Sequence, residues 1–265
     1  MVIVLLVLAA LLAVGGGLLV RSAVDSSRRA ARLTAIAPSS CGELLDEVDA
    51  VTSQLGHGAL RRETELTGMG SPAGTPLIGP FSGQSVLWYS ATITHHYWKT
   101  SHSTDSQGRS TTSRAKAREV VSTEVSDAAR LAVCDGTGAV EVALRAARID
   151  QPRLLHDRMQ APPPGPSLSI GPLKIGGRSS SIGYQHVELA LVPGEQLYVS
   201  GVVRPAAGGG IELAAAPGHE LLVSTRSEQE LITHYLRSAQ YKGAGAIGIG
   251  VAVVAALGGA VAVAL

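Results

Sequence analysis

The chain has 265 residues, with 22 lysines and arginines against 21 aspartates and glutamates, and 3% of it is aromatic. A formal net charge of +1 gives no electrostatic footprint for nucleic acid. Two cysteines, Cys41 and Cys134, are too few for a disulfide framework or a multi-ligand zinc module. No charge falls in residues 1–20 or 243–265. A soluble domain between two apolar ends is therefore expected, which argues against a cytosolic enzyme, a secreted disulfide scaffold and a DNA-binding protein.

The first apolar run, residues 2–20, is just long enough to cross a bilayer core of about 30 Å. A signal peptide would have basic residues before a shorter run and a small-residue cleavage site after it. Here only Met1 precedes the run, and arginines follow it. We expect residues 1–20 to form an uncleaved transmembrane helix and residues 21–38 to form a basic juxtamembrane linker.

The second apolar run, residues 243–265, contains no polar residue, which favours a transmembrane helix over a buried core helix. Tyrosines and cations of the kind found at membrane interfaces precede it. A capping box from Thr225 to Glu228 predicts a juxtamembrane helix over residues 227–242 that leads into this run.

Both predicted spans carry their arginines and lysines on the side of the central domain. Because such residues tend to stay cytoplasmic, we expect a multi-pass cell-membrane protein with both termini outside and residues 21–242 in the cytoplasm. The spans are rich in glycine, and small residues let helices approach closely in lipid. We therefore expect the two spans to pair with each other or across a homodimer. The alternative is that the glycines reflect only an alanine- and glycine-rich coding bias.

Residues 39–56 are predicted to form an amphipathic helix. Ser40 and Glu43 fit a capping box, apolar residues follow at helical spacing, and Gly56 ends the run. Cys41 lies in the first turn, where the helix dipole lowers a thiol pKa, but no histidine or lysine is near it in sequence. A structural role for Cys41 is favoured over a nucleophile.

Residues 61–226 read as short strands separated by glycine- and proline-rich turns. The expected strands are Glu63–Thr67, Ser85–Trp98, Arg118–Val125, Leu131–Cys134, Ala139–Leu144, Tyr184–Leu191, Gln196–Val203 and Ile211–Ala214. Thr100–Ser113 is polar without apolar periodicity and predicts a loop, and the proline-rich stretch Ala161–Gly177 predicts irregular structure. The fold class is mainly β (α+β), an antiparallel β sandwich or small barrel with flanking helices.

No residue pattern predicts a catalytic, cofactor or metal site. His95 and His96 would point to opposite faces of a strand, so with His102 they are better explained as solvated strand-end histidines than as zinc ligands. Glycines in Gly70–Gly79 lack the lysine of a phosphate loop, and Gly243-Ala244-Gly245 opens an apolar span rather than a dinucleotide site. No nucleophile elbow is present in the sequence.

Other polar and aromatic residues have structural interpretations. Carboxylates of the amphipathic helix are expected on its solvated face: Asp46, Glu47 and Asp49. Asp135 is expected to accept amides of a tight hairpin turn that contains Gly136 and Gly138. Most of the large aromatic residues are expected in the core rather than on a ligand platform: Trp88, Tyr89, Trp98, Tyr184 and Tyr198.

Several strings, in this order over about residues 70–231, resemble the GIDE domain, also called the beside-a-membrane (BAM) domain. They are Pro80-Phe81-Ser82-Gly83, Val86-Leu87-Trp88-Tyr89, Tyr97-Trp98, Cys134-Asp135-Gly136-Thr137-Gly138-Ala139-Val140-Glu141-Val142, Ile182-Gly183-Tyr184, Pro193-Gly194-Glu195-Gln196-Leu197-Tyr198-Val199-Ser200-Gly201 and Ser224-Thr225-Arg226-Ser227-Glu228-Gln229-Glu230-Leu231. The resemblance implies kinship with MULAN-type E3 ubiquitin ligases, which carry this domain between two spans and end in a RING finger. The alanine-, arginine- and glycine-rich composition is typical of a bacterial member without the RING.

Three functional hypotheses follow. The leading one is a membrane-anchored, non-catalytic module that binds an unknown protein partner, forms a homodimer or scaffolds an assembly at the lipid bilayer. The second is E3 ubiquitin transfer, as the resemblance implies, although a RING needs about eight Cys or His ligands for two zinc ions and these residues include two cysteines. The third is a small-molecule sensor with a pocket between the β domain and residues 161–177.

Overall fold

A computed structural model describes residues 2–56, 59–104, 106–162, 168–170, 173–175, 181–206 and 210–264. The chain forms two compact units. The helical unit comprises Met1–Pro38 and Arg226–Leu265, and the β unit comprises Ser39–Thr225.

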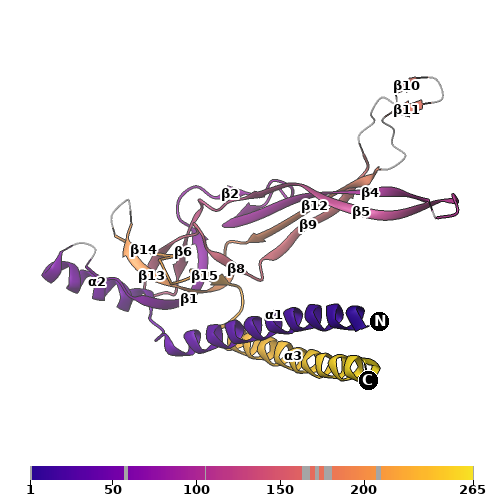
Figure 1. Cartoon of the computed structure of the whole chain (residues 1–265). Coiled ribbons are helices and arrows are strands. Elements are labelled where there is room, and N and C mark those ends of the chain that lie inside the picture. The colour runs from indigo at the N-terminus through magenta and orange to yellow at the C-terminus, as the bar shows by residue number, and fades with distance from the viewer. Residues whose placement is uncertain are drawn as a thin grey trace. The chain divides into compact units, whose positions relative to one another are not determined.

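The helical unit consists of α1 (Val2–Ala35) and α3 (Glu228–Ala264). The two helices lie side by side and antiparallel, so the N-terminal end of α1 and the C-terminal end of α3 are at the same end of the pair (Figure 1). Residues 21–35, expected as part of a linker, continue α1 without a break. The physical reason is that alanine, arginine and leucine are good helix formers, so a basic composition does not end a helix.

The capping box of α3 lies two residues beyond the one predicted from sequence. The Ser227 amide donates to the Glu230 carboxylate (3.0 Å), and the Glu230 amide donates to Ser227 Oγ (3.4 Å). The predicted cap, Thr225, instead donates its hydroxyl to the Gln151 carbonyl (2.8 Å), which holds it in the β unit. The capping box is therefore Ser227–Glu230, and the Thr225–Glu228 prediction was wrong.

By length and composition, one helical segment among the described residues could cross a membrane, Ala9–Ala35. Membrane anchors and N-terminal signal sequences both meet this criterion. The second span predicted at 243–265 is not found among the described residues, although α3 passes through this stretch as a continuous helix. The described structure thus supports one candidate anchor.

The β unit contains a closed five-stranded barrel. Its strands, in spatial order, are β1 (Glu63–Pro72), β6 (Arg130–Cys134), β7 (Ala139–Ala143), β14 (Ile211–Ala214) and β13 (Gln196–Pro205). Pairing of β13 with β1, from Glu63↔Val202 to Met69↔Gln196, closes the barrel. This closure confirms a small barrel and excludes a sandwich. Within the barrel the β7–β14 pair is parallel, and the other four strand pairs are antiparallel. Strands β15 (Leu222–Ser224) and β8 (Arg148–Asp150) extend the sheet from β13.

The hydrophobic core fills this barrel. Alternate residues of β6 and β7 are fully buried, as the period of two in a half-buried strand requires. Helix α2 (Cys41–Leu55) begins at the Ser40–Glu43 capping box, which is confirmed. Its Leu44 is completely buried in the same core. The predicted amphipathic helix thus packs its apolar side chains into the barrel core.

A second sheet of four antiparallel strands extends away from the barrel (Figure 1). Its spatial order is β5 (Ser110–Val125), β4 (Trp88–Thr104), β12 (Ser181–Leu191) and β9 (Arg153–Gln160). We call this sheet the arm. The predicted loop Thr100–Ser113 is largely strand, because β4 and β5 remain paired as far as Thr104↔Ser110. Both faces of this hairpin end are exposed, so its sequence lacks the apolar alternation that reveals a half-buried strand.

Two short hairpins complete the β unit. Strands β2 (Leu77–Ile78) and β3 (Ser85–Val86) pair near the start of the arm. Strands β10 (Leu168–Ile170) and β11 (Leu173–Ile175) pair within the stretch Ala161–Gly177, which was expected to be wholly irregular. The prolines lie outside these two strands, so they do not prevent the pairing. The rest of that stretch beyond residue 162 lies outside the described residues.

Candidate functional site

The two outer strands of the arm, β5 and β9, are largely exposed. Fifteen of the sixteen residues of β5 are exposed, including Val120 (64%) and Val121 (56%). At the other edge, Leu154 and Met159 of β9 are also exposed. A sheet normally buries at least one face against another layer. The arm therefore presents strand surface and edges that a partner can contact.

One face of the arm carries a row of ring side chains, which we call the aromatic face. The His95 ring stacks on Tyr184, with centroids 4.7 Å apart, and on Tyr97, with centroids 5.0 Å apart. His95 Nε2 also lies 2.9 Å from Ser181 Oγ. Nearer the barrel, the Phe81 ring tilts over His186 at 5.0 Å. Rings stacked in this way hold each other in place.

A buried carboxylate fixes the turn that presents Phe81. Glu188 of β12 is completely buried, and it accepts hydrogen bonds from the Phe81 amide (2.6 Å), the Ser82 amide (3.0 Å) and the Ser82 hydroxyl (2.5 Å). The turn closes at Gly83, whose φ of +68° suits glycine. Glu188 is thus the structural partner of the Pro80–Gly83 motif. Three hydrogen bonds of this kind satisfy the polar atoms of a buried carboxyl group.

The opposite face, which we call the cationic face, centres on Trp98. The Arg114 guanidinium carbon lies 4.7 Å from the Trp98 ring centroid, and Lys116 Nζ lies 5.5 Å from it. Such cation–π contacts orient both the ring and the cations. On the same face, His96 Nε2 donates to Gln185 Oε1 (3.1 Å), whose amide nitrogen donates in turn to an aspartate of β9 (2.7 Å).

The predicted aromatic core is found only in part. Trp88 (8% exposed) and Tyr198 (2% exposed) are buried, as expected. Tyr89, Trp98 and Tyr184 are only partly buried and lie on the arm. The prediction was wrong for these three because, among the described residues, no second sheet packs over the strands that carry them.

The predicted histidines do not converge. His95 and His96 contact neighbouring β12 residues on opposite faces, which confirms the alternation argued from sequence. His102 Nδ1 lies 3.0 Å from Thr112 Oγ1 across the hairpin. Within the described part of the chain, no group of three or more His, Cys, Asp or Glu residues is placed to hold a metal ion.

Cys41 is a structural thiol. It is completely buried, and its Sγ donates to the Val133 carbonyl at 3.4 Å. Burial first, and then the negative charge of Asp135, raises the pKa of the Cys41 thiol to about 12. The helix-dipole effect suggested by its position in the first turn is therefore outweighed. Cys134 is also a free thiol, and its Sγ lies 3.4 Å from Ser71 Oγ.

Asp135 joins α2 to the β6–β7 turn. One carboxylate oxygen accepts from the Cys41 amide (2.7 Å), and the other accepts from the Thr137 amide (2.9 Å) and hydroxyl (2.6 Å). Burial by itself would raise the pKa of Asp135, but hydrogen bonds from Thr137, Cys41 and Gly138 outweigh it and lower the pKa to about 2. The predicted turn role is confirmed, and the tertiary contact with α2 is new.

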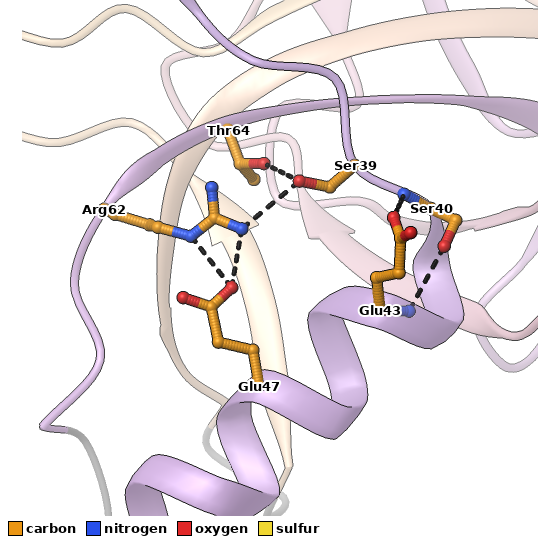
Figure 2. A network of polar contacts seen from close by, with 6 residues as sticks. All are labelled: Ser39, Ser40, Glu43, Glu47, Arg62 and Thr64. Atoms are coloured by element: carbon orange, nitrogen blue, oxygen red, sulfur yellow. Dashed lines mark hydrogen bonds and ion pairs between the residues drawn. The ribbon is translucent and has the colours of Figure 1, made fainter.

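A second polar network holds α2 against the chain before β1. Figure 2 shows Arg62 reaching Glu47, with Arg62 Nη2 donating to Glu47 Oε2 at 2.6 Å and to Ser39 Oγ at 3.2 Å. The Thr64 hydroxyl also donates to Ser39 Oγ (3.1 Å). Asp46 and Asp49 are exposed, as predicted, but Glu47 is ion-paired. The acidic helix face is thus only partly a solvated one.

Comparison with protein families gives a match over residues 100–258 to GIDE, described as E3 Ubiquitin ligase. The chain belongs to the GIDE family. Comparisons with curated proteins and with solved structures gave no match. The family match begins near the end of β4 and runs through β5 and the later barrel strands into α3. It therefore takes in the distal arm and much of the C-terminal helix, while the strings noted at residues 80–98 precede it.

Proposed function

We propose that this GIDE-family chain is a membrane-anchored, non-catalytic binding module. In this proposal the helical unit is embedded in the bilayer and the arm binds the partner. The observation that carries the proposal is the contrast in burial within one unit, since a barrel with a closed core supports a sheet whose outer strands, β5 and β9, are largely exposed. Exposed strand surface on a rigid scaffold is a common form of recognition site.

In this proposal the anchor has two spans, of which the second goes beyond the one candidate span found by length and composition. Ala9–Ala35 has the length and composition of a span, and α3 continues through the charge-free stretch as far as Ala264. A Cβ built on Gly16 would lie 3.2 Å from Ile249 Cγ2, which is tighter than usual packing. Glycine at this position thus lets the helices approach closely, as paired membrane helices do. The family match also extends to residue 258, inside this second stretch.

The antiparallel pairing of α1 and α3 is compatible with the expected topology, in which both chain termini lie on the outer side of the membrane. The arginines at residues 21–32 follow the first apolar run, and Lys242 precedes the second. Because such residues tend to stay cytoplasmic, we propose that the β unit is cytoplasmic.

A binding role also agrees with how the acidic and thiol groups are used. Glu188, Asp135 and Cys41 each make structural hydrogen bonds within the β unit. The family description is E3 Ubiquitin ligase, and a RING finger requires about eight Cys or His zinc ligands that converge on two ions. Residues 1–265 include two cysteines and eight histidines, and among the described residues no group of three or more His, Cys, Asp or Glu residues is placed to hold a metal ion. We therefore infer that this part of the family fold supplies recognition rather than ubiquitin transfer.

Two measurements test the anchor. The full chain should stay in the membrane pellet after alkaline carbonate extraction, and a compartment-sensitive reporter inserted after Gly165 should give a cytoplasmic signal. Release into the supernatant would contradict the anchor. A reporter signal from outside would contradict the orientation but would leave the anchor standing.

Ubiquitin transfer is the second candidate, because the family description names it. It predicts stoichiometric zinc in the purified full chain and faster discharge of a ubiquitin-charged carrier enzyme. The binding-module proposal predicts neither result. Zinc together with stimulated discharge would replace the proposal.

A further inference from the structure

Positive charge is concentrated at the distal end of the β4–β5 hairpin. Between residues 96 and 118 the sequence has a net charge of +4, against +1 for the whole chain. The basic residues are Lys99, Arg109, Arg114, Lys116 and Arg118, and the one acidic residue is Asp105. The remainder of the chain therefore carries a net charge of −3.

The same segment projects beyond the rest of the arm. Among the described residues, β12 pairs with β4 as far as Ser181↔Tyr97, while β4 and β5 continue to Thr104↔Ser110. We call Trp98–Thr104 together with Ser110–Arg118 the cationic ribbon. Apart from Trp98 and Ala117, its residues are exposed. A ribbon with both faces exposed can meet a flat surface without rearrangement.

Trp98 gives the cationic ribbon an interfacial side chain. Its ring is partly buried beneath Arg114 and Lys116 on the cationic face. In register, Trp98 lies opposite Lys116, and two positions further along β4, Thr100 lies opposite Arg114. An indole ring flanked by cations combines an amphipathic group, which prefers the membrane–water interface, with groups that bind phosphate.

We infer that the cationic ribbon binds the anionic phospholipid headgroups of a bilayer. Arg114 and Lys116 contact the phosphates, and Trp98 lies at the headgroup level. This inference rests on the proposed function, because the anchor keeps the β unit close to a membrane and so raises the effective concentration of headgroups.

An acidic protein is a weaker match to the same surface. Stable protein interfaces usually centre on a packed apolar or aromatic cluster with a polar rim. The cationic ribbon has a single large ring, Trp98, and its other residues are mostly threonine, serine and cations. Its chemistry thus suits a broad anionic surface better than a shaped pocket.

The test uses the full chain in lipid nanodiscs and follows tryptophan fluorescence. The chain has two tryptophans, Trp88 and Trp98, and both belong to the β unit. Because Trp88 is buried, brominated phospholipids that contact the cationic ribbon quench Trp98. One set of nanodiscs contains neutral phosphatidylcholine alone and the other adds anionic phosphatidylglycerol. Brominated vesicles of the same two compositions, added to neutral nanodiscs, test docking on a second bilayer.

We expect quenching and a blue shift of the emission with anionic lipid, in the same or a second bilayer, and loss of both in high salt. The double variant Arg114→Glu/Lys116→Glu should weaken docking about 30-fold or more, from about fivefold for each cation lost. The matched control Arg61→Glu/Arg145→Glu makes the same charge change at exposed residues outside the arm and should leave docking nearly unchanged.

Four results would overturn the inference. The first two are equal quenching by neutral and anionic lipid, and no effect of the double variant on quenching. The third is a shift of Trp98 emission with polyglutamate but with neither bilayer. The fourth is aggregation of the double variant when lipid leaves the Trp98 emission of the wild type unchanged. The last would mean that the cations only protect an edge strand from pairing with other chains. Failure of the chain to stay in nanodiscs would count against the proposed anchor instead, so the two failures are distinguishable.

Discussion

The barrel and the arm use the same kind of element and differ in what covers it. In the barrel each strand has a neighbour on both sides, and inward residues such as Leu131 and Val133 are fully buried. In the arm, β5 and β9 each pair with one strand among the described residues, and both are largely exposed. The barrel is thus specified by packing, whereas the arm is free to carry cations and rings for recognition.

The largest expected effect contrasts equal substitutions in the two regions. Leu131→Ala in the barrel removes a completely buried side chain and should lower the free energy of unfolding by about 2–5 kcal/mol. Leu154→Ala in the arm, at a residue 55% exposed, should change it by about 0.5 kcal/mol or less. Chemical unfolding of the detergent-solubilised chain, followed by Trp88 fluorescence, measures both. Equal losses would mean that the arm is packed as tightly as the barrel.

The junction between the two regions comes next. Glu188→Ala removes the acceptor of three hydrogen bonds. It should lower the free energy of unfolding by about 2–3 kcal/mol, because the Phe81 and Ser82 donors are left without their partner. Glu119→Ala, at a 60% exposed carboxylate of β5, is the control and should be nearly neutral. Hydrogen exchange of the Phe81 and Ser82 amides should rise sharply in the Glu188 variant only. Unchanged protection there would refute the role assigned to Glu188.

Acid should lower the free energy of unfolding of the β unit through protonation of Asp135. Its pKa is about 2 in the folded chain against an ordinary value of 3.8, so its stabilising effect is present above about pH 4 and is lost as the pH falls toward 2. Because the group is partly exposed, the expected loss is about 1 kcal/mol. Asp135→Asn should flatten the stability profile between pH 4 and 2, measured by chemical unfolding. An unaltered profile would assign the acid sensitivity to other groups.

The smallest effect concerns the acidic face of α2. Glu47→Gln breaks the contact with Arg62 seen in Figure 2 and should cost about 0.5 kcal/mol, as partly exposed ion pairs do. Asp46→Asn, on an exposed neighbour, should have no measurable effect. A double-mutant cycle that combines Glu47→Gln with Arg62→Met measures the coupling energy of this pair. A coupling energy of zero would contradict this role of the ion pair and would favour the solvated position predicted from sequence for Glu47.

Local signals in the sequence predicted much of the framework. The capping box at Ser40 and the Asp135 turn were predicted correctly because each depends on residues within a few positions. The distal hairpin was missed because strands exposed on both faces have no apolar period to detect. Three arm aromatics were misplaced in the core for the same reason, since hydrophobicity alone does not show whether a second layer covers a strand.

The sequence by itself determined the family, the apolar first run, the mainly β class and most of the strands, because composition and short-range periodicity carry that information. Only the tertiary structure decided that β13 returns to β1 and closes a barrel, and that Trp98 lies beneath Arg114 and Lys116. Closure joins segments more than a hundred residues apart, and neighbouring strands bring the ring and the cations together. Pairing over such separations depends on the packing of the whole β unit, which no local pattern encodes.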